Sequence, residues 1–160
     1  MKKNFTLGNI KEIRAKMEFY CAYQERCYKE IEHKLFEFQM SSTEREETIM
    51  YLIENNFVNE ERFAKSFVRG KHNYKFWGKN RIINELKFRN ISSRNIQIAL
   101  QEIPETTYLQ NFHIIAEKNW ETIKDPKGPK KNKKFVDFLL RKGYETNLIY
   151  EKLNELEAGS

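Results

Sequence analysis

Residues 82–103 read IINELKFRNISSRNIQIALQEI, and this stretch decides the fold. Ile82 and Leu86 are four residues apart, the spacing that places apolar side chains on one face of an α-helix. Ile91 follows after five residues, and Ser92 then supplies a side-chain oxygen of the kind that caps a new helix. The stretch therefore predicts two consecutive helices joined by a short turn, over residues 78–90 and 92–103.

The same pattern occurs three times along the chain. Leu86 aligns with Leu35, 51 residues earlier, and with Leu139, 53 residues later. An apolar residue stands four positions before each leucine, and again five, fourteen and seventeen positions after it. Self-similarity at a nearly constant period is typical of proteins built from stacked structural repeats. We therefore predict that the chain consists of three related units.

Each predicted unit contains three helices, so the expected fold is all-α, with three tandem three-helix repeats. A single small unit buries little apolar surface, whereas stacked units cover one another, and we expect an elongated, curved molecule. The predicted units are residues 1–56, 57–105 and 106–160. Their first helices are expected at 9–23, 59–73 and 106–123, their second at 27–39, 78–90 and 131–143, and their third at 42–55, 92–103 and 145–156.

Polar residues mark several of these helix starts. The segment Thr43-Glu44-Arg45-Glu46 fits a capping box, in which a hydroxyl and a carboxylate satisfy main-chain amides reciprocally. Asn59 precedes two glutamates, which suits the positive end of a helix. Both signals support the predicted boundaries.

Several classes of protein are disfavoured by composition. No apolar run approaches the roughly 20 residues that a membrane-spanning helix needs, and Met1–Phe5 lacks the apolar stretch of a signal peptide. Cys21 and Cys27 lie six residues apart, which turns them to different faces of a helix and favours two buried thiols. We therefore expect a cytoplasmic protein, in a reducing setting and without membrane association.

Charge is distributed unevenly, although the net charge is only +6. From residue 30 to 61, nine acidic residues are opposed by two basic ones, a net charge of −7. From residue 65 to 94 the net charge is +8, and from 127 to 142 it is +6. Because a merely solubilising surface interleaves both signs, the basic stretches are candidates for binding an anionic partner.

The first candidate site is a basic band in the second unit. Arg62, Lys65 and Arg69 have the spacing of one helix face. Four further cations follow, with Phe76 and Trp77 between them: Lys71, Lys75, Lys79 and Arg81. Lysine and arginine neutralise phosphates and release condensed counterions, so the band favours nucleic acid or an acidic protein surface over a plain solvated face. We expect Trp77 to pack over the turn between two helices rather than to stack on a base.

The second candidate site is a lysine-rich segment at the start of the third unit's second helix. Pro126, Gly128 and Pro129 predict a loop that enters a helix. The lysines around it are Lys127, Lys130, Lys131, Lys133 and Lys134. A flexible arm that touches phosphate or an acidic patch and a solvated loop are equally compatible with this pattern.

No catalytic or metal-binding pattern stands out. His33, His72 and His113 are scattered and are expected to be ordinary surface residues. No set of His, Cys, Asp and Glu has the spacing of a metal site, and no glycine-rich phosphate loop is present. No Ser or Cys nucleophile has a visible base. We therefore predict a protein without enzymatic activity, cofactor or metal.

The middle of the chain contains Asn59-Glu60-Glu61-Arg62-Phe63-Ala64-Lys65-Ser66-Phe67-Val68-Arg69 and Phe76-Trp77-Gly78, followed by Glu85-Leu86 and Asn90-Ile91. These motifs resemble those of the RecX family, regulators of the RecA recombinase. The ending Leu139-Leu140-Arg141-Lys142-Gly143-Tyr144 is similar to that family too, and Gln24–Leu35 is similar to its opening. Two departures are Cys27, where Ser is more usual, and Asn90, where Gly is common; Asn also tolerates a left-handed turn.

This resemblance implies a function that the charge pattern does not show. It implies three three-helix repeats, binding along the groove of the RecA–DNA filament, and modulation, usually inhibition, of RecA's ATPase and strand exchange. It also implies that DNA itself is a partner for some members. We expect a monomer. The alternatives from the residues alone are a DNA-binding helical-repeat protein without a recombinase partner and a structural adaptor whose basic band is unused.

Overall fold

The computed structural model describes residues 9–159, and the regular structure within them is α-helical. Nine helices follow one another in this part of the chain. They are α1 (Ile10–Tyr23), α2 (Tyr28–Leu35), α3 (Ser42–Glu54), α4 (Glu60–Lys75), α5 (Lys79–Phe88), α6 (Ser93–Leu100), α7 (Glu105–Thr122), α8 (Pro129–Lys142) and α9 (Thr146–Ala158). The prediction of an all-α fold of three-helix repeats is confirmed.

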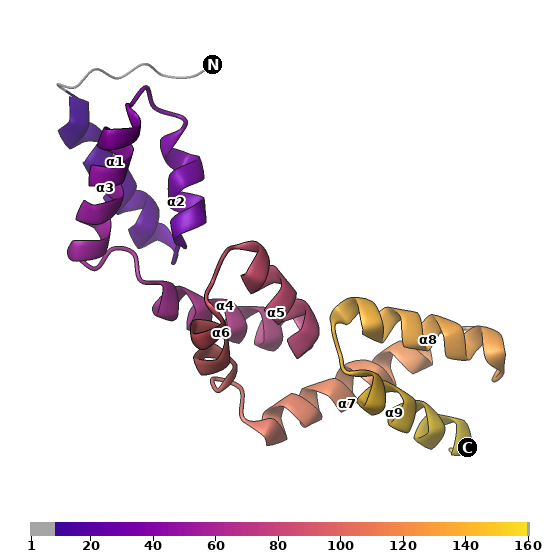
Figure 1. The fold of residues 1–160 in the computed structure, drawn as a ribbon. Helices are drawn as coiled ribbons and strands as arrows, with labels where there is room; N and C mark the ends of the chain where they lie inside the picture. The colour runs from indigo at the N-terminus through magenta and orange to yellow at the C-terminus, as the bar shows by residue number, and fades with distance from the viewer. Residues whose placement is uncertain (1–8, 160) are drawn as a thin grey trace.

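The three groups of helices follow one another along the molecule instead of surrounding one centre. Figure 1 shows α1–α3 at one end, α4–α6 in the middle and α7–α9 at the other end. We call these groups unit 1, unit 2 and unit 3. Within residues 9–159, contacts between the units therefore lie at two places, between units 1 and 2 and between units 2 and 3.

Among residues 9–159, buried apolar side chains form two clusters rather than three. One belongs to unit 1 and includes Ile13, Met17 and Leu35. The other is continuous through units 2 and 3, from Phe63 in α4 to Leu153 in α9, and it also contains Cys27 of unit 1. Units 2 and 3 therefore share one core, whereas unit 1 has its own. The aligned leucines of the repeat belong to these clusters, since Leu35, Leu86 and Leu139 are fully buried.

Most helices begin and end as their sequences predict, with two corrections. The capping box of α3 uses Ser41, not Thr43: the Ser41 hydroxyl accepts a hydrogen bond from the Glu44 amide, and the Glu44 carboxylate accepts one from the Ser41 amide. Helix α2 ends at Leu35, not at residue 39. From Phe36 to Phe38 each amide bonds to a carbonyl three residues earlier, which tightens the chain into a turn.

Other boundary signals agree with the structure. The Asn59 side chain accepts from the Arg62 amide and Ser92 accepts from the Asn95 amide. Asn90 adopts the left-handed conformation, with φ of 60°. Both cysteines are buried and unpaired, as predicted, and burial raises the pKa of each thiol to about 11. No helix among residues 9–159 has the length and apolar character needed to cross a bilayer.

Candidate functional site

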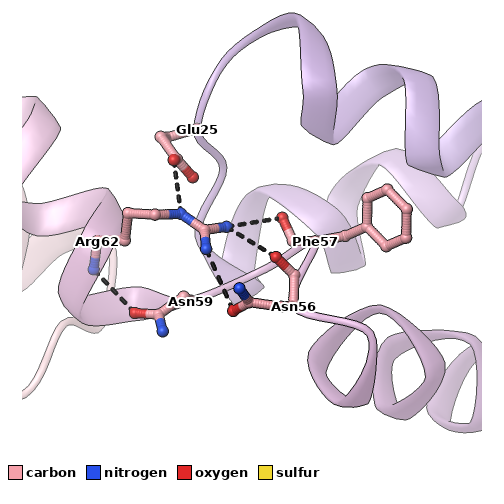
Figure 2. Close-up of polar contacts among 5 residues, drawn as sticks. All are labelled: Glu25, Asn56, Phe57, Asn59 and Arg62. Atoms are coloured by element: carbon pink, nitrogen blue, oxygen red, sulfur yellow. Dashed lines mark hydrogen bonds and ion pairs between the residues drawn. The ribbon is translucent and has the colours of Figure 1, made fainter.

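The first junction, between units 1 and 2, is organised around Arg62. Figure 2 shows its guanidinium enclosed by acceptors on the preceding segments. Nε donates to Glu25 at 2.6 Å, Nη1 donates to the Asn56 side chain at 3.2 Å, and Nη2 donates to the carbonyls of Asn56 and Phe57 at 3.1 and 3.3 Å. All three guanidinium nitrogens are thus used inside the protein. Arg62, predicted to contact a partner, instead joins α4 to the chain on either side of α2 and α3.

Further contacts at this junction come from the start of α2. The Tyr28 amide donates to the Glu60 carboxylate at 2.9 Å, and the Lys29 ammonium donates to the Phe88 carbonyl at 2.6 Å while lying 4.0 Å from the Phe88 ring centroid. Cys27, the residue before α2, is fully buried in the core of units 2 and 3. The first junction is therefore held by side chains that reach to the other unit, with one buried thiol between them.

The second junction, between units 2 and 3, is made by the main chains themselves. The Gly78 amide donates to the Lys142 carbonyl at 2.7 Å, and the Asn80 amide donates to the Gly143 carbonyl at 2.9 Å. A Cβ on Gly78 would overlap the Gly143 carbonyl, and a Cβ on Gly143 would overlap Arg81. Gly143 also has a φ of 100°. Both glycines are needed because only residues without a side chain let the two segments approach this closely.

Buried phenols complete the second junction. The Tyr108 hydroxyl accepts from the Lys79 amide at 2.9 Å and donates to the Glu145 carboxylate, and the Tyr144 hydroxyl donates to the Phe76 carbonyl at 2.8 Å. Burial, followed by the hydrogen bond to Glu145, raises the pKa of Tyr108 far above its ordinary value. Burial raises the pKa of Tyr144 in the same direction. Both phenols therefore stay neutral at ordinary pH, and they stabilise the contact between the units.

His72 belongs to this junction, contrary to the prediction that it is a surface residue. Its side chain is fully buried. Nδ1 lies 2.9 Å from the Trp77 carbonyl and Nε2 lies 3.1 Å from the Asn111 amide nitrogen. A carbonyl can only accept, so Nδ1 carries the proton, and Nε2 then accepts from Asn111. Burial lowers the pKa of His72, which keeps the ring neutral.

Several cations of the predicted basic band are neutralised by carboxylates from outside it. Lys65 pairs with Glu61 at 3.1 Å. Arg69 pairs with Glu102 at 2.7 Å and Lys79 with Glu105 at 3.2 Å. The stretch from residue 65 to 94 is poor in acids along the sequence, but Glu61 lies one turn before Lys65 on α4, and the fold brings Glu102, between α6 and α7, and Glu105, at the start of α7, beside it. The five strongest candidates, Arg62, Lys65, Arg69, Lys79 and Arg81, do not share one set of contacts.

Three members of the band make no ion pair with a carboxylate of residues 9–159, and two of them lie over the Trp77 ring. The Arg81 guanidinium carbon is 4.0 Å from the indole centroid, and the Lys71 ammonium is 5.0 Å from it. Lys75 is exposed at the end of α4. Trp77 is partly buried and packs against the core, as predicted, with Phe67 at 6.2 Å between centroids. Lys71 and Arg81 thus lie against the indole of Trp77.

Lys142 of unit 3 joins this group, although the sequence did not single it out. The Lys142 ammonium donates to the Lys75 carbonyl at 3.0 Å, while Arg81 donates to the Arg141 carbonyl at 3.2 Å, so cations from the two units cross the junction in opposite directions. Burial, and then the positive charges of Arg81 and Lys75, lower the pKa of Lys142. We call Lys71, Lys75, Arg81 and Lys142, together with Trp77, the junction cluster.

The lysine-rich segment is helical rather than a free arm. Helix α8 begins at Pro129, so the residues from Lys130 onward belong to it. Lys133 pairs with Asp137 and Lys134 with Asp125, both at 2.8 Å, and Lys131 lies 4.0 Å from the Trp120 centroid. Lys130 is exposed and makes no ion pair with residues 9–159. Most of this charge is thus engaged within unit 3.

The proximity of Arg81 to Lys142 could not be predicted from their separation of 61 residues. The repeat alignment gives one indication of Lys142. It places Lys142 of unit 3 at the same position as Arg89 of unit 2, so both units carry a cation at the end of the second helix. As for metals, residues 9–159 contain no group of three or more His, Cys, Asp or Glu side chains placed to hold an ion. The junction cluster is therefore the candidate site that the described residues offer.

Comparison with known proteins shows the family. Residues 59–100 match the model of the second three-helix domain of RecX, and residues 106–153 match the model of the third. This chain belongs to the RecX family. The resemblance found in the sequence is confirmed, and the junction cluster of this chain spans both matched domains, with Lys71, Lys75 and Arg81 in the second and Lys142 in the third.

Relatives and solved structures agree with this assignment. The chain is 27% identical over 138 residues to the regulatory protein RecX of Bacillus cytotoxicus and to that of Bacillus mycoides, covering 86% of this chain and 51% of each relative. It therefore spans about half the length of the curated RecX relatives it matches. The crystal structure of RecX from Lactobacillus salivarius superposes with a TM-score of 0.78 at 25% identity, over 95% of this chain and 99% of that one. A second crystal structure of regulatory protein RecX has a TM-score of 0.79 at 21% identity, over 92% and 72%.

Proposed function

We propose that this protein regulates the RecA recombinase, as an inhibitor, by binding along the groove of the RecA–DNA filament. It thereby lowers ATP turnover and strand exchange in homologous recombination and DNA repair. Membership of the RecX family is the observation on which the proposal depends. We further propose that it acts as a monomer in the cytoplasm, without cofactor or enzymatic activity.

The arrangement of the units supports this proposal. Three units in a row present an extended surface, which fits a long partner better than a small ligand (Figure 1). A recombinase filament displays phosphate and acidic protein surface together, and the junction cluster offers positive charge without bound carboxylates. A protein that lies in the groove opposes the rearrangements that ATP turnover requires, because it binds one filament state better than another.

The direct test is RecA's ATPase on single-stranded DNA, titrated with this protein to saturation. The wild type is expected to lower the rate, and Lys75→Ala with Arg81→Ala is expected to need at least about tenfold more protein for the same effect. Lys11→Ala with Lys124→Ala is the matched control, since both lysines are exposed and lie outside the cluster. An ATPase rate that stays unchanged at saturating wild type contradicts the proposal.

A further inference from the structure

We propose that a groove in unit 1, between α1 and α2, binds an acidic amphipathic helix of another protein, just as the equivalent surface of unit 2 is covered by unit 1. The groove is separate from the junction cluster, which lies at the border of units 2 and 3, and its use does not depend on the proposed regulation of RecA. Three observations support it: the exposure of the groove, the segment that covers its counterpart in unit 2, and its charge.

The groove has a volume of about 940 Å³ and is lined mainly by apolar side chains. Phe19 and Tyr23, one turn apart on α1, are 74% and 75% exposed. Tyr20 and Phe38 are partly buried and pack against the core of unit 1 from inside the groove. Exposed rings beside an apolar depression of this size are typical of a surface that binds another apolar group.

Unit 2 has the same surface, and there unit 1 covers it. With the offset of 51 residues that relates Leu35 to Leu86, four residues lining the groove correspond to four lining a cavity in unit 2. The pairs are Ala15 with Ser66, Lys16 with Phe67, Tyr20 with Lys71, and Phe38 with Arg89. That cavity measures only about 280 Å³, and Gln24, Glu25 and Glu30 of unit 1 form one of its walls. The groove is therefore the surface of this repeat on which a neighbouring helical segment docks.

Charge indicates that the occupant is acidic. Two cations, Lys71 and Arg89, line the cavity of unit 2, and the covering segment contributes two carboxylates to it. The groove of unit 1 is lined by three cations and one carboxylate, although residues 30–61 as a whole are acidic. The cations are Lys16, Arg26 and Lys34, and the carboxylate is Glu37. A helix with apolar and acidic side chains therefore complements the groove in the way that unit 1 complements unit 2.

Arg26 is the cation that is best placed to bind such a carboxylate. Its Nε donates to the Tyr20 carbonyl at 3.1 Å, and its guanidinium carbon lies 3.7 Å from the Tyr20 ring centroid. No carboxylate of residues 9–159 forms an ion pair with it, whereas Lys34 pairs with Glu37 at 3.0 Å. The remaining N–H groups of Arg26 are thus held beside the rings and can donate to an acidic side chain of the occupant.

A second copy of this chain is a poor occupant. The part of unit 3 that would dock on the groove is the connection from α7 into α8, and its lysines are Lys124, Lys127 and Lys130. Asp125, the carboxylate of this connection, pairs with Lys134 at 2.8 Å. At the position of Cys27 and Gly78, unit 3 has Lys131 within α8, so helix replaces the turn that docks at both junctions. Cations would meet cations, which favours a different protein as the occupant.

The experiment measures binding of fluorescent helical peptides to the full chain by anisotropy. The first peptide is about 15 residues long, with Leu and Phe at every third or fourth position and Glu and Ala at the others. A second peptide has Lys in place of Glu, and a third has Ser in place of Leu and Phe. The wild type is expected to bind the first peptide at least about tenfold more tightly than the other two, because the groove needs both acidic and apolar side chains.

Substitutions in the groove test whether the peptide binds there. Phe19→Ala with Tyr23→Ala is expected to weaken binding of the acidic peptide at least about tenfold, and Arg26→Gln about threefold. Tyr74→Ala with Tyr150→Ala is the matched control, since these tyrosines are 85% and 51% exposed in units 2 and 3. Circular dichroism and thermal unfolding verify that each variant is folded.

Other outcomes would overturn the proposal. Lys124→Gln removes an exposed cation of unit 3 and should leave binding of the acidic peptide unchanged. The proposal is wrong if the wild type binds the Lys-containing peptide as tightly, or if the groove variants bind the acidic peptide like the wild type. It is also wrong if the wild type sediments as an oligomer that Phe19→Ala with Tyr23→Ala dissociates, because the groove would then hold a second copy. These measurements contain no recombinase, so failure of the proposed regulation would leave their result unchanged.

Discussion

The two junctions of this protein share a pattern of hydrogen bonds but differ in the groups that make the other contacts. At each of them the first amide of a unit's second helix donates to a side chain of the next unit's first helix, Tyr28 to Glu60 and Lys79 to Tyr108. At each of them a cation one turn or less along the same helix donates to a carbonyl at the end of the next unit's second helix. These pairs are Lys29 with Phe88 and Arg81 with Arg141.

The two junctions differ in the groups that fill the rest of the interface between the units. At the second junction two main chains bond directly, with glycine against glycine, and the apolar core runs through both units. At the first junction Cys27 stands where the second has Gly78, and the guanidinium of Arg62 bridges the units instead. A contact between main chains costs no side-chain conformational entropy, and side-chain rotation cannot break it. We infer that units 2 and 3 unfold together, whereas unit 1 can separate from them.

The largest expected effect comes from adding one methyl group at the second junction. Gly78→Ala places a Cβ on the Gly143 carbonyl, and neither main chain can move without breaking its hydrogen bonds. We expect the free energy of unfolding to fall by about 2 to 3 kcal/mol, measured by urea denaturation. Gly70→Ala is the control, because a Cβ at Gly70 in α4 meets open space. It is expected to stabilise the protein by about 0.5 to 1 kcal/mol; equal destabilisation by both variants would contradict the close packing of the two glycines.

Removing the Arg62 side chain, which bridges the first junction, is expected to lower the free energy of unfolding by less and to affect unit 1 alone. Arg62→Ala leaves Glu25 and the carbonyls of Asn56 and Phe57 without their donor, which should lower the free energy of unfolding by about 2 kcal/mol. Amide hydrogen exchange should accelerate in α1–α3 and remain slow in α7–α9. Arg69→Ala removes an exposed pair with Glu102 and should change stability by about 0.5 kcal/mol or less. Uniformly faster exchange would show that the units are not independent.

A pH dependence is expected from the second junction through His72. Because burial lowers its pKa in the folded state, the unfolded chain binds the proton more readily. The stabilising contribution is complete above the unfolded pKa of about 6.5 and declines as pH falls below it towards the folded pKa. Urea midpoints at pH 7.5 and pH 5.5 measure this decline. It should shrink in His72→Gln but persist in His113→Gln, whose histidine is exposed.

The smallest effect on stability is expected from a substitution at the residue that follows the second helix of unit 2. Asn90 and Gly143 end the second helices of units 2 and 3, and both have positive φ. Asn90→Gly should change the free energy of unfolding by no more than about 0.5 kcal/mol, since relief of the left-handed strain offsets the added chain entropy. Gly143→Asn should resemble Gly78→Ala, because its Cβ would overlap Arg81. If the two exchanges are equally tolerated, close packing does not distinguish the junctions.

Local rules were enough to predict the fold. Apolar spacing and caps are properties of neighbouring residues, so the positions of the nine helices in residues 9–159 could be predicted to within a few residues. The largest error, the end of α2, arose because Phe36–Phe38 keep helix-like spacing while their hydrogen bonds shorten into a turn. The repeat and the family resemblance could likewise be recognised from residue types at fixed spacing.

The site could be predicted only in part, because charge is not a local property. Whether a cation is paired depends on which carboxylates the fold places beside it. The partners of Arg62, Arg69 and Lys79 lie 26 to 37 residues away in the sequence; they are Glu25, Glu102 and Glu105. The same folding brings Lys142 to Lys75 and buries His72 between the units. Sequence determined the helices, the repeat and the excess of positive charge, since these depend on composition and periodicity. Tertiary structure alone decided which of those charges stay available, since Coulomb interactions depend on distance in space and not along the chain.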